Sequence, residues 1–263
     1  MTTLTPYQIY DLLNRPRPLW LVKIDLSDAS LWLADLSGAD LSWANLNRTD
    51  LSRATLIRTN LSRANLSSAN LYEAILSRAI LVGANLIRTD LTRADLGKAD
   101  LSEADLTEAN LARASFSMAT MLGTNLNNTT GNRADFSKAD MAGANLTGAD
   151  LQLANLFEAN LTRARMGRVR LNRSDMNRAN LSGANLTEAD LSGADLTGAR
   201  LLHADFTRAI LKGVDFTGAD VTGAKFEGAD LADANVKDTD LSKANLTGSS
   251  LAPAARPVTP GMR

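Results

Sequence analysis

The sequence of 263 residues has no cysteine and a single histidine, His203. Without cysteine the chain can form neither a disulfide framework nor a thiolate metal site. No stretch approaches the 18 consecutive apolar residues of a membrane-spanning helix, so we expect none. Residues 1–18 also lack the basic start and apolar segment of a secretory signal, and the cytoplasm is the expected compartment.

Aromatic residues are scarce as well, at 5% of the chain, although apolar residues reach 44%. A hydrophobic core therefore has to be built mainly from leucine and alanine. Charge of either sign is not in excess, since the formal net charge is -1 at pH 7. A chain this close to neutral has no global attraction to nucleic acid or to an anionic membrane.

What the sequence does have is a repeat of five residues. A central apolar residue, most often leucine, recurs every five positions from Leu26 to Leu251, which makes 46 units without a slip of phase. Alanine usually stands two positions before it and Asp or Asn directly before it, while Ser or Thr often follows. The unit reads A-(D/N)-L-(S/T)-x, and repeats of this regularity indicate a repetitive architecture.

A period of five fits neither regular secondary structure. On an α-helix five residues advance about 500°, so successive leucines would move around the axis. On a strand they would alternate between faces. To place every central residue in one core, the chain has to turn a corner in each unit. Asp, Asn, Ser and Thr beside the corner can then satisfy the backbone groups that a turn leaves free.

With this unit over residues 24–251, the sequence resembles the pentapeptide-repeat proteins, which are abundant in cyanobacteria. The resemblance implies an all-β solenoid, a right-handed quadrilateral β-helix with four units per coil. The 46 units would then make about 11.5 coils. At ~4.8 Å between hydrogen-bonded neighbours, the rod would be roughly 55 Å long.

The two ends of such a stack need a cover, because they expose sheet edges and core. Thr5 followed by Pro6 is typical of a helix start, so residues 6–14 predict a short capping helix. Membrane attachment of this helix is the alternative. We expect three parts: residues 1–23 with the capping helix and lead-in, residues 24–251 with the repeat, and residues 252–263 as a flexible tail. A poorly covered last coil would favour an end-to-end homodimer.

Gly131 is the one irregularity of the core, because it occupies a central position. An unfilled site there would cost a few kcal/mol relative to leucine. The neighbouring central residues Phe116, Met121, Phe136 and Met141 are larger or more adaptable than usual, and we expect them to fill the space. The functional alternative is a bulge or docking notch.

No pattern in the sequence points to catalysis. There is no P-loop, no G-x-G-x-x-G after a strand and no cluster with metal-ligand spacing. A rod filled with leucine and alanine has no cleft to hold a nucleophile and a base. His203 falls on an outward position, so a Ser-His-Asp arrangement would be accidental. We expect a protein that is not an enzyme, with no catalytic residue, no cofactor and no metal.

The outer surface carries two mostly basic rows, because residues four units apart should lie one coil apart on the same face. The Arg53 row consists of Arg53, Glu73, Arg93, Arg113, Arg133, Leu153 and Arg173. The Arg58 row, on the next face, consists of Arg58, Arg78, Lys98, Met118, Lys138, Glu158 and Arg178. The simpler interpretation is solvated charge neutralised by neighbouring rows. Because stacked like charges cost stability in a sheet, a partner-binding surface is the alternative.

Charge also differs along the chain. Residues 48–178 contain 17 basic and 13 acidic residues, and residues 179–251 contain 6 basic and 11 acidic, so the net charges are +4 and -5. A local arginine cluster consists of Arg163, Arg165, Arg168, Arg170 and Arg173. In the C-terminal part, Asp175, Asp195 and Asp215 should stack, as should Asp220 and Asp240. The rod is therefore expected to be electrically polarised.

A small apolar patch is the other candidate contact surface. Ile75 and Ile80 replace the usual Asp or Asn, and Ile57 and Val82 lie near them in the repeat. Exposed apolar groups of this kind can mark a contact site. Trp32, Leu33 and Trp43 on the first coils are equally compatible with packing under the N-terminal segment.

These features favour a protein-binding scaffold or regulatory module with an unidentified protein partner, because a rigid rod suits extended contacts. The alternative is DNA mimicry, since some proteins of the resembled family match B-DNA in size and charge and bind DNA gyrase. Those members are strongly acidic and have a dimerising C-terminal helix, which this chain lacks. Direct nucleic-acid binding is disfavoured by the interleaved acids and scarce aromatics.

Overall fold

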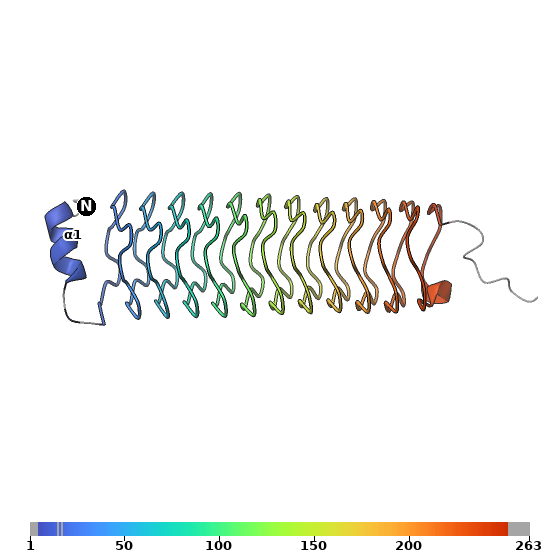
Figure 1. Ribbon diagram of the computed structural model, residues 1–263, viewed down its shortest axis with the longest axis horizontal. Helices are drawn as coiled ribbons and strands as arrows, with labels where there is room; N and C mark the ends of the chain where they lie inside the picture. The colour runs from blue at the N-terminus through green and yellow to red at the C-terminus, as the bar shows by residue number, and fades with distance from the viewer. Residues whose placement is uncertain (1–4, 15, 17, 252–263) are drawn as a thin grey trace, which may run out of the picture.

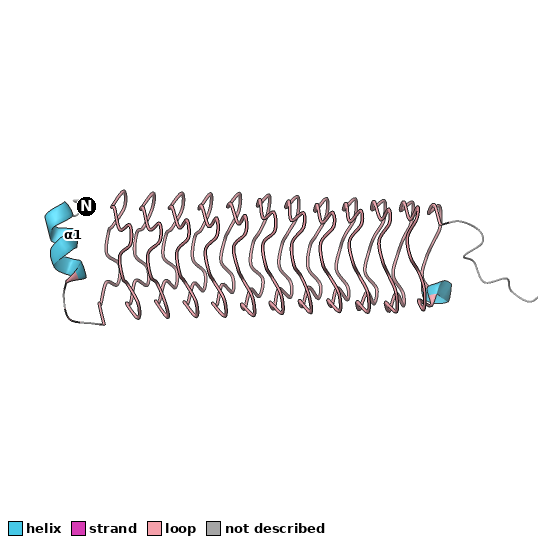
Figure 2. Cartoon of the chain, in the orientation of Figure 1, coloured by secondary structure: helices cyan, strands magenta, loops and turns pink. Residues whose placement is uncertain are grey.

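The computed structural model describes residues 5–14, 16 and 18–251, and within them the chain forms a straight rod of stacked coils (Figure 1). Parallel β-bridges join one outward residue of a unit to its equivalent four units further on, from Trp20–Asp40 to Lys225–Asn245. One coil is therefore four units, and the quadrilateral coil is present. Each bridge involves a single residue, and the coils are therefore drawn as loops in Figure 2.

The backbone hydrogen bonds explain why this unit stacks. In the unit 104–108, the N–H of Ala104 closes the turn on the Leu101 carbonyl at 2.9 Å. The next N–H, of Asp105, donates to the preceding coil at 2.9 Å, and those of Leu106 and Glu108 donate to the following coil at 2.7 and 3.0 Å. The fifth N–H, of Thr107, donates to the side chain of Asp105 at 2.9 Å. All five donors are satisfied, as a buried backbone requires.

This pattern confirms the role predicted for Asp and Asn beside the corner. Their side-chain oxygen accepts the N–H two positions on, as in an Asx turn. Asn155 does so for Phe157 at 3.0 Å, and Asp195 for Thr197 at 2.8 Å. Ile75 and Ile80 cannot, so the N–H groups of Ser77 and Val82 have no acceptor among the described residues.

The last residue of each unit has a positive φ from Lys23 to Asp238, with glycine at some corners and a side chain at the others. This is the third residue of a type II turn, where glycine fits without steric cost. Arg113, for example, has a φ of 59°. The corners therefore set the outward direction of the rows, and a non-glycine residue there carries a backbone cost.

The interior is a continuous ladder of central residues with alanine between them. Leu106 and Leu111 are each 0% exposed, and the alanines before them, Ala104 and Ala109, are equally enclosed. Phe116 and Phe136, one coil apart, stack with ring centroids 5.0 Å apart. Phe206 and Phe226 do the same at 5.1 Å. Leucine and alanine build this core, as the composition predicts.

The space at Gly131 is filled by a residue other than the four we expected. A Cβ on Gly131 would lie 2.6 Å from Cδ2 of Leu151, one coil on in the same ladder. The Leu151 side chain therefore occupies this space. The side chains of Phe116, Met121, Phe136 and Met141 are not needed to fill it. The ladder does not bulge, because the N–H of Gly131 donates to the Asp150 carbonyl at 2.7 Å.

Helix α1, Pro6–Leu13, precedes the coils, and Figure 1 shows it at the N-terminal end of the rod. Thr5 caps it in a capping box with Gln8, because the Thr5 hydroxyl accepts the Gln8 N–H at 3.3 Å. Ile9 and Leu12 are buried in the same cluster as Leu19 and Leu21. The described residues contain no helix long and apolar enough to cross a membrane.

The C-terminal end differs from the regular coils. A short 3-10 helix, η1 (Leu241–Lys243), interrupts the last coil, and Asp240 caps it by accepting the Ser242 N–H at 3.0 Å. Asp175, Asp195 and Asp215 are bridged in succession as expected, but among the described residues no bridge joins Asp220 and Asp240. Central residues Leu241, Leu246 and Leu251 are only partly buried. The tail predicted for residues 252–263 lies outside the described residues.

Candidate functional site

The two basic rows lie at neighbouring corners of the coil, one unit apart in the chain. Between them runs a line of outward bridge positions that we call the middle row. It consists of Thr55, Ile75, Asp95, Ser115, Asp135, Asn155, Asp175, Asp195 and Asp215. We call the side of the rod bounded by the Arg53 row and the Arg58 row the shared face.

The Arg53 row is partly neutralised. Glu73 lies between two arginines of its own row and pairs with Arg53 and Arg93, each at 3.0 Å. The Tyr72 hydroxyl and then the guanidinium groups of Arg93 and Arg53 lower the pKa of Glu73, so it is ionised at neutral pH. Arg113, Arg133 and Arg173 are exposed and form no ion pair within the described part of the chain.

The first three cations of the Arg58 row are not neutralised by ion pairs within the described structure. Arg58, Arg78 and Lys98 follow one another in consecutive coils, are all exposed, and have no ion pair among residues 5–14, 16 and 18–251. Further along, Glu158 pairs with Lys138 at 3.7 Å and Arg178 at 3.6 Å. The uncompensated positive charge of this row is therefore confined to the first three members.

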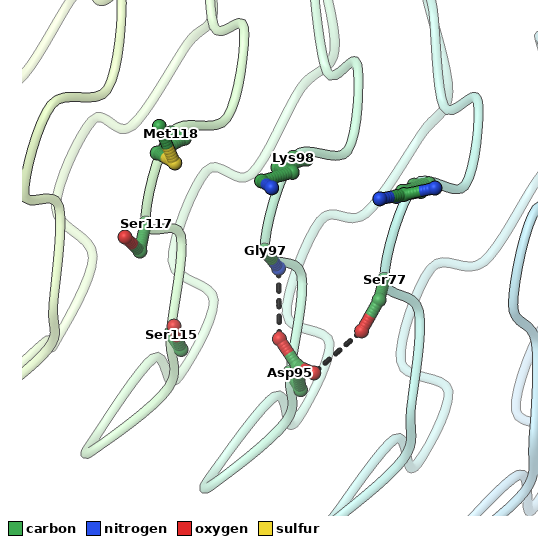
Figure 3. A pocket seen from close by; sticks show the side chains of 8 residues that line it. Ser77, Asp95, Gly97, Lys98, Ser115, Ser117 and Met118 are labelled. Carbon is green, nitrogen blue, oxygen red and sulfur yellow. Dashed lines mark hydrogen bonds between the residues drawn. The ribbon is translucent and has the colours of Figure 1, made fainter.

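A shallow hollow of about 350 Å³ opens beside this charge. Gly97 has no side chain there, and Figure 3 shows Asp95 bound to the Gly97 N–H and the Ser77 hydroxyl. Our expectation of a rod without any cleft is wrong at this outer corner. The hollow is lined by Ser77, Arg78, Asp95, Gly97, Lys98, Ser115, Ser117 and Met118.

The arginine cluster near residue 168 is distributed around the rod and does not form one face. Arg168 and Arg173 occupy successive corners, with Arg170 on the side between them. Two of the members are also neutralised, since Arg168 pairs with Glu188 at 2.8 Å and Arg170 with Asp150 at 3.0 Å. Arg165 is exposed and bridged between Asn145 and Asn185. The cluster is therefore a weaker candidate than the two rows.

The apolar patch is likewise divided. Ile75 lies in the middle row and Ile80 on the next side of the rod, with the Ser77 corner between them, and they are 40% and 44% exposed. Ile57 is exposed on the same corner one coil earlier, and Val82 is half-buried at the following corner. Ile57 and Ile75 thus border the shared face, whereas Ile80 and Val82 belong to its neighbour.

Sequence reasoning missed two features that bear on binding. The pairing of Glu73 with both neighbouring arginines was readable from the row order, since opposite charges at equivalent positions of successive coils meet across the coil step. The hollow was signalled by Gly97, because serine occupies the equivalent position in the coil before it and in the coil after it. Among the described residues no group of three His, Asp or Glu side chains is placed to hold a metal ion.

Comparison with known proteins agrees with the geometry. The family model described as Pentapeptide repeats matches ten overlapping stretches between residues 21 and 248. Among solved structures, HetL, a pentapeptide repeat protein involved in heterocyst differentiation regulation from Nostoc sp. strain PCC 7120, is 33% identical. The match covers 94% of this chain and 98% of HetL, with a TM-score of 0.36. No curated protein sequence matches.

Two further solved structures are more distant. QnrB1, a plasmid-mediated fluoroquinolone resistance protein, is 19% identical over 82% of this chain and 88% of its own, with a TM-score of 0.35. Rfr23 from the cyanobacterium Cyanothece 51142 is 25% identical over 49% of this chain and 85% of its own, with a TM-score of 0.32. The repeat, its coil of four units and the family match together show that the chain belongs to the pentapeptide-repeat family.

Proposed function

We propose that this protein is a non-enzymatic binding scaffold whose shared face recognises an acidic protein surface. The observation that carries the proposal is the run of uncompensated cations, Arg58, Arg78 and Lys98 on one edge and Arg113 and Arg133 on the other. A rigid rod holds these groups at a fixed spacing, so little order has to be imposed when a partner binds.

Glycine would fit the corners of these side chains at a lower backbone cost. Arg113 and Arg133 have φ values of 59° and 60°, in the region where glycine is favoured. Later corners of the same row do use glycine, at Gly193 and Gly213. The fold therefore does not require arginine at these corners, although side chains at positive φ stand at most corners of the rod and are not specific to this face.

Ile75 gives a second, independent indication. It stands where Asp or Asn would accept the N–H two residues on, and a hydrogen bond of this kind contributes about 1 kcal/mol. Ile75 is nevertheless 40% exposed, beside the hollow at Gly97. Ile75 lies between the Glu73 and Arg78 corners of its own coil, and an exposed apolar group of this kind can mark a contact site.

The stability cost predicts a measurable trade-off. Replacing Arg113 by glycine relieves the positive φ, and we expect the free energy of unfolding to rise by about 0.5–1 kcal/mol. Urea denaturation followed by circular dichroism measures this change. Arg113→Ala keeps the positive-φ strain while removing the charge, so it is the control. A destabilised Arg113→Gly variant would contradict the assignment of strain.

The binding face can be tested with matched variants. One variant replaces three corner cations of the shared face by glycine, and the control replaces three cations from the other two corners. Proteins bound from native cell lysate are then quantified. We expect the first variant to lose at least about tenfold of the bound partner and the control to retain it. Equal retention by both would reject the shared face. The substituted residues are Arg78, Lys98 and Arg113, against Arg63, Arg163 and Arg208.

DNA mimicry with gyrase as the partner is the second candidate, and one observation favours it. Asp175, Asp195 and Asp215 do stack in successive coils, as a phosphate-like row would. This acidic run is short, and the basic rows before it would repel a surface that binds DNA. A gyrase supercoiling assay distinguishes the two functions, because a scaffold that binds through arginine should leave supercoiling unchanged.

A further inference from the structure

The shared face reverses its charge towards the C-terminal end. Beyond Arg173 and Arg178, both basic rows continue with glycine: Gly193 and Gly213 in one, Gly198 and Gly218 in the other. The middle row carries Asp175, Asp195 and Asp215 over the same coils. The first half of the face thus carries mainly arginine and lysine, interspersed with Glu73, Asp95 and Asp135, and its second half carries aspartate flanked by glycine.

These aspartates are available to an outside cation. Asp195 and Asp215 form no ion pair within the described residues, and each accepts the N–H of a threonine two positions on, at 2.8 Å. The Thr217 hydroxyl and N–H lower the pKa of Asp215, which keeps it ionised. Asp233 and Asp238, at the next two corners of the same rows, are exposed and also have no ion pair in this part of the chain.

We propose that two copies of this protein pair side by side and antiparallel through the shared face, the basic half of each covering the acidic half of the other. The proposed partner of the shared face is thus a second copy of the chain, and the proposal rests on the function proposed above. A twofold axis perpendicular to the rod keeps each row over the same row of the second copy and reverses its direction.

One register places cations of one copy level with aspartates of the other in three consecutive coils, although it also brings Asp135 level with Asp195 in the middle row. When Leu153 lies level with Arg173 of the second copy, Arg133 lies level with Gly193 and Asp195, and Arg113 with Gly213 and Asp215. One coil further, Arg93 and Lys98 lie level with Asp233 and Asp238. The coil step is constant at four units, so a register correct at one coil is correct at every coil. Seven steps of ~4.8 Å make a contact about 34 Å long.

The glycine corners leave room for the arginine side chains of the other copy in this register. Arg133 and Arg113 would each face a corner that has no side chain, so a guanidinium can lie across it and reach the aspartate of the middle row. Since arginine has a planar fork of donors, it can bind such a carboxylate through two hydrogen bonds. The same pairing with side chains at Gly193 and Gly213 would be obstructed.

The centre of the contact combines one exposed leucine with polar and charged groups. Leu153 interrupts the Arg53 row and is 42% exposed. Beside it is a hollow of about 340 Å³ whose lining includes Leu153 and Arg173. In the proposed register Leu153 of each copy lies level with Arg173 of the other, next to that hollow, so the contact forms twice by symmetry. Isologous contacts of this kind are usual in twofold dimers.

Sedimentation of the full chain tests the pairing. At about 100 μM protein and low salt we expect a dimer, which dissociates in about 1 M salt, where the Debye length is about 3 Å. In the variant Asp195→Asn with Asp215→Asn the turn acceptors are kept, as Asn155 shows, and only charge is lost. We expect its dimer to be at least about tenfold weaker. Wild-type protein that stays monomeric at low salt overturns the proposal.

A charge exchange separates the pairing from a general loss of stability. Asp195→Arg with Asp215→Arg should abolish the dimer, and adding Arg133→Asp with Arg113→Asp should restore it. Both kinds of residue already occur at such positions, since Arg165 and Arg170 occupy bridge positions and Asp233 a corner. Failure of the fourfold variant to pair, while it unfolds like the wild type, would reject the register.

Crosslinking locates the contact. Because the sequence has no cysteine, only the introduced thiols can react. In the proposed register Ser137 lies level with Thr197 of the second copy. Ser137→Cys with Thr197→Cys should give crosslinked dimers with a short thiol reagent, whereas Ser77→Cys with Thr197→Cys, displaced by three coils, should not. A salt-resistant dimer without this crosslink would be an end-to-end dimer and overturns the proposal. If the wild type is monomeric but still captures an acidic partner, only the self-pairing fails and the proposed function stands.

Discussion

Deletion of residues 91–110 is expected to leave a folded, shorter rod. The deletion removes four whole units, which is the step between bridged positions, so Asp90 is followed by Leu111 and every later residue keeps its role in the unit. Stability in a solenoid is approximately a sum over repeats and their contacts. We therefore expect one cooperative transition with a denaturant m-value lower by roughly a tenth, measured by urea unfolding.

Deletion of Ala112 alone is the matched control and is expected to have the opposite effect. A unit that has lost one residue cannot place both its alanine and its central residue in the core, since the side of the coil becomes too short. The N–H groups of that coil would also lose their carbonyl partners on the neighbouring coil. We expect a loss of more than about 4 kcal/mol and separate unfolding of the two halves. A single transition at wild-type stability would contradict the strict step of four units.

Leu151→Ala is expected to be the most damaging single truncation of a central leucine. Leu151 is 1% exposed and fills its own site and the space left by Gly131. Removing it empties both, and the cost of a leucine truncation grows with the volume of the remaining cavity. We expect a loss of about 4–5 kcal/mol, against about 3 kcal/mol for Leu106→Ala, whose ladder neighbours are ordinary leucines.

A second substitution tests the cause of that difference. In the Leu151→Ala background, Gly131→Leu restores a leucine to the adjacent coil, and we expect it to recover about 1–2 kcal/mol because it refills the shared space. In the wild-type background the same change forces the Leu151 side chain to move, so it should not stabilise the protein. Equal losses for Leu151→Ala and Leu106→Ala in urea unfolding would show that Leu151 does not occupy the Gly131 space.

The architecture was predictable because it depends on local, repeated choices. Leu106 and its equivalents point inward at every fifth position, and Asp105 and its equivalents accept the turn N–H, so each unit specifies its own corner. The order of outward residues followed directly, because one coil is a whole number of units. The repeat alone predicts that Arg53, Glu73 and Arg93 lie in a single row.

The energetics of the candidate site were less accessible to sequence reasoning. The arginines near residue 168 are close in the chain, yet Arg168 and Arg170 are on different sides of the rod and are neutralised from neighbouring coils. The four isoleucine and valine residues of the apolar patch are similarly divided by a corner. Residues that are close in the sequence lie on different sides of the same coil. Side-chain contacts on the surface instead join residues that are a whole coil apart.

The sequence by itself determined the solenoid, its register and the order of charges along each face, because a period of five without slips permits only one way to bury the central residues. Only the tertiary structure decided which charges remain uncompensated, that Leu151 rather than its aromatic neighbours fills the Gly131 space, and that the arginines occupy positive-φ corners. These depend on distances between coils and on side-chain conformations, which a one-dimensional pattern does not contain.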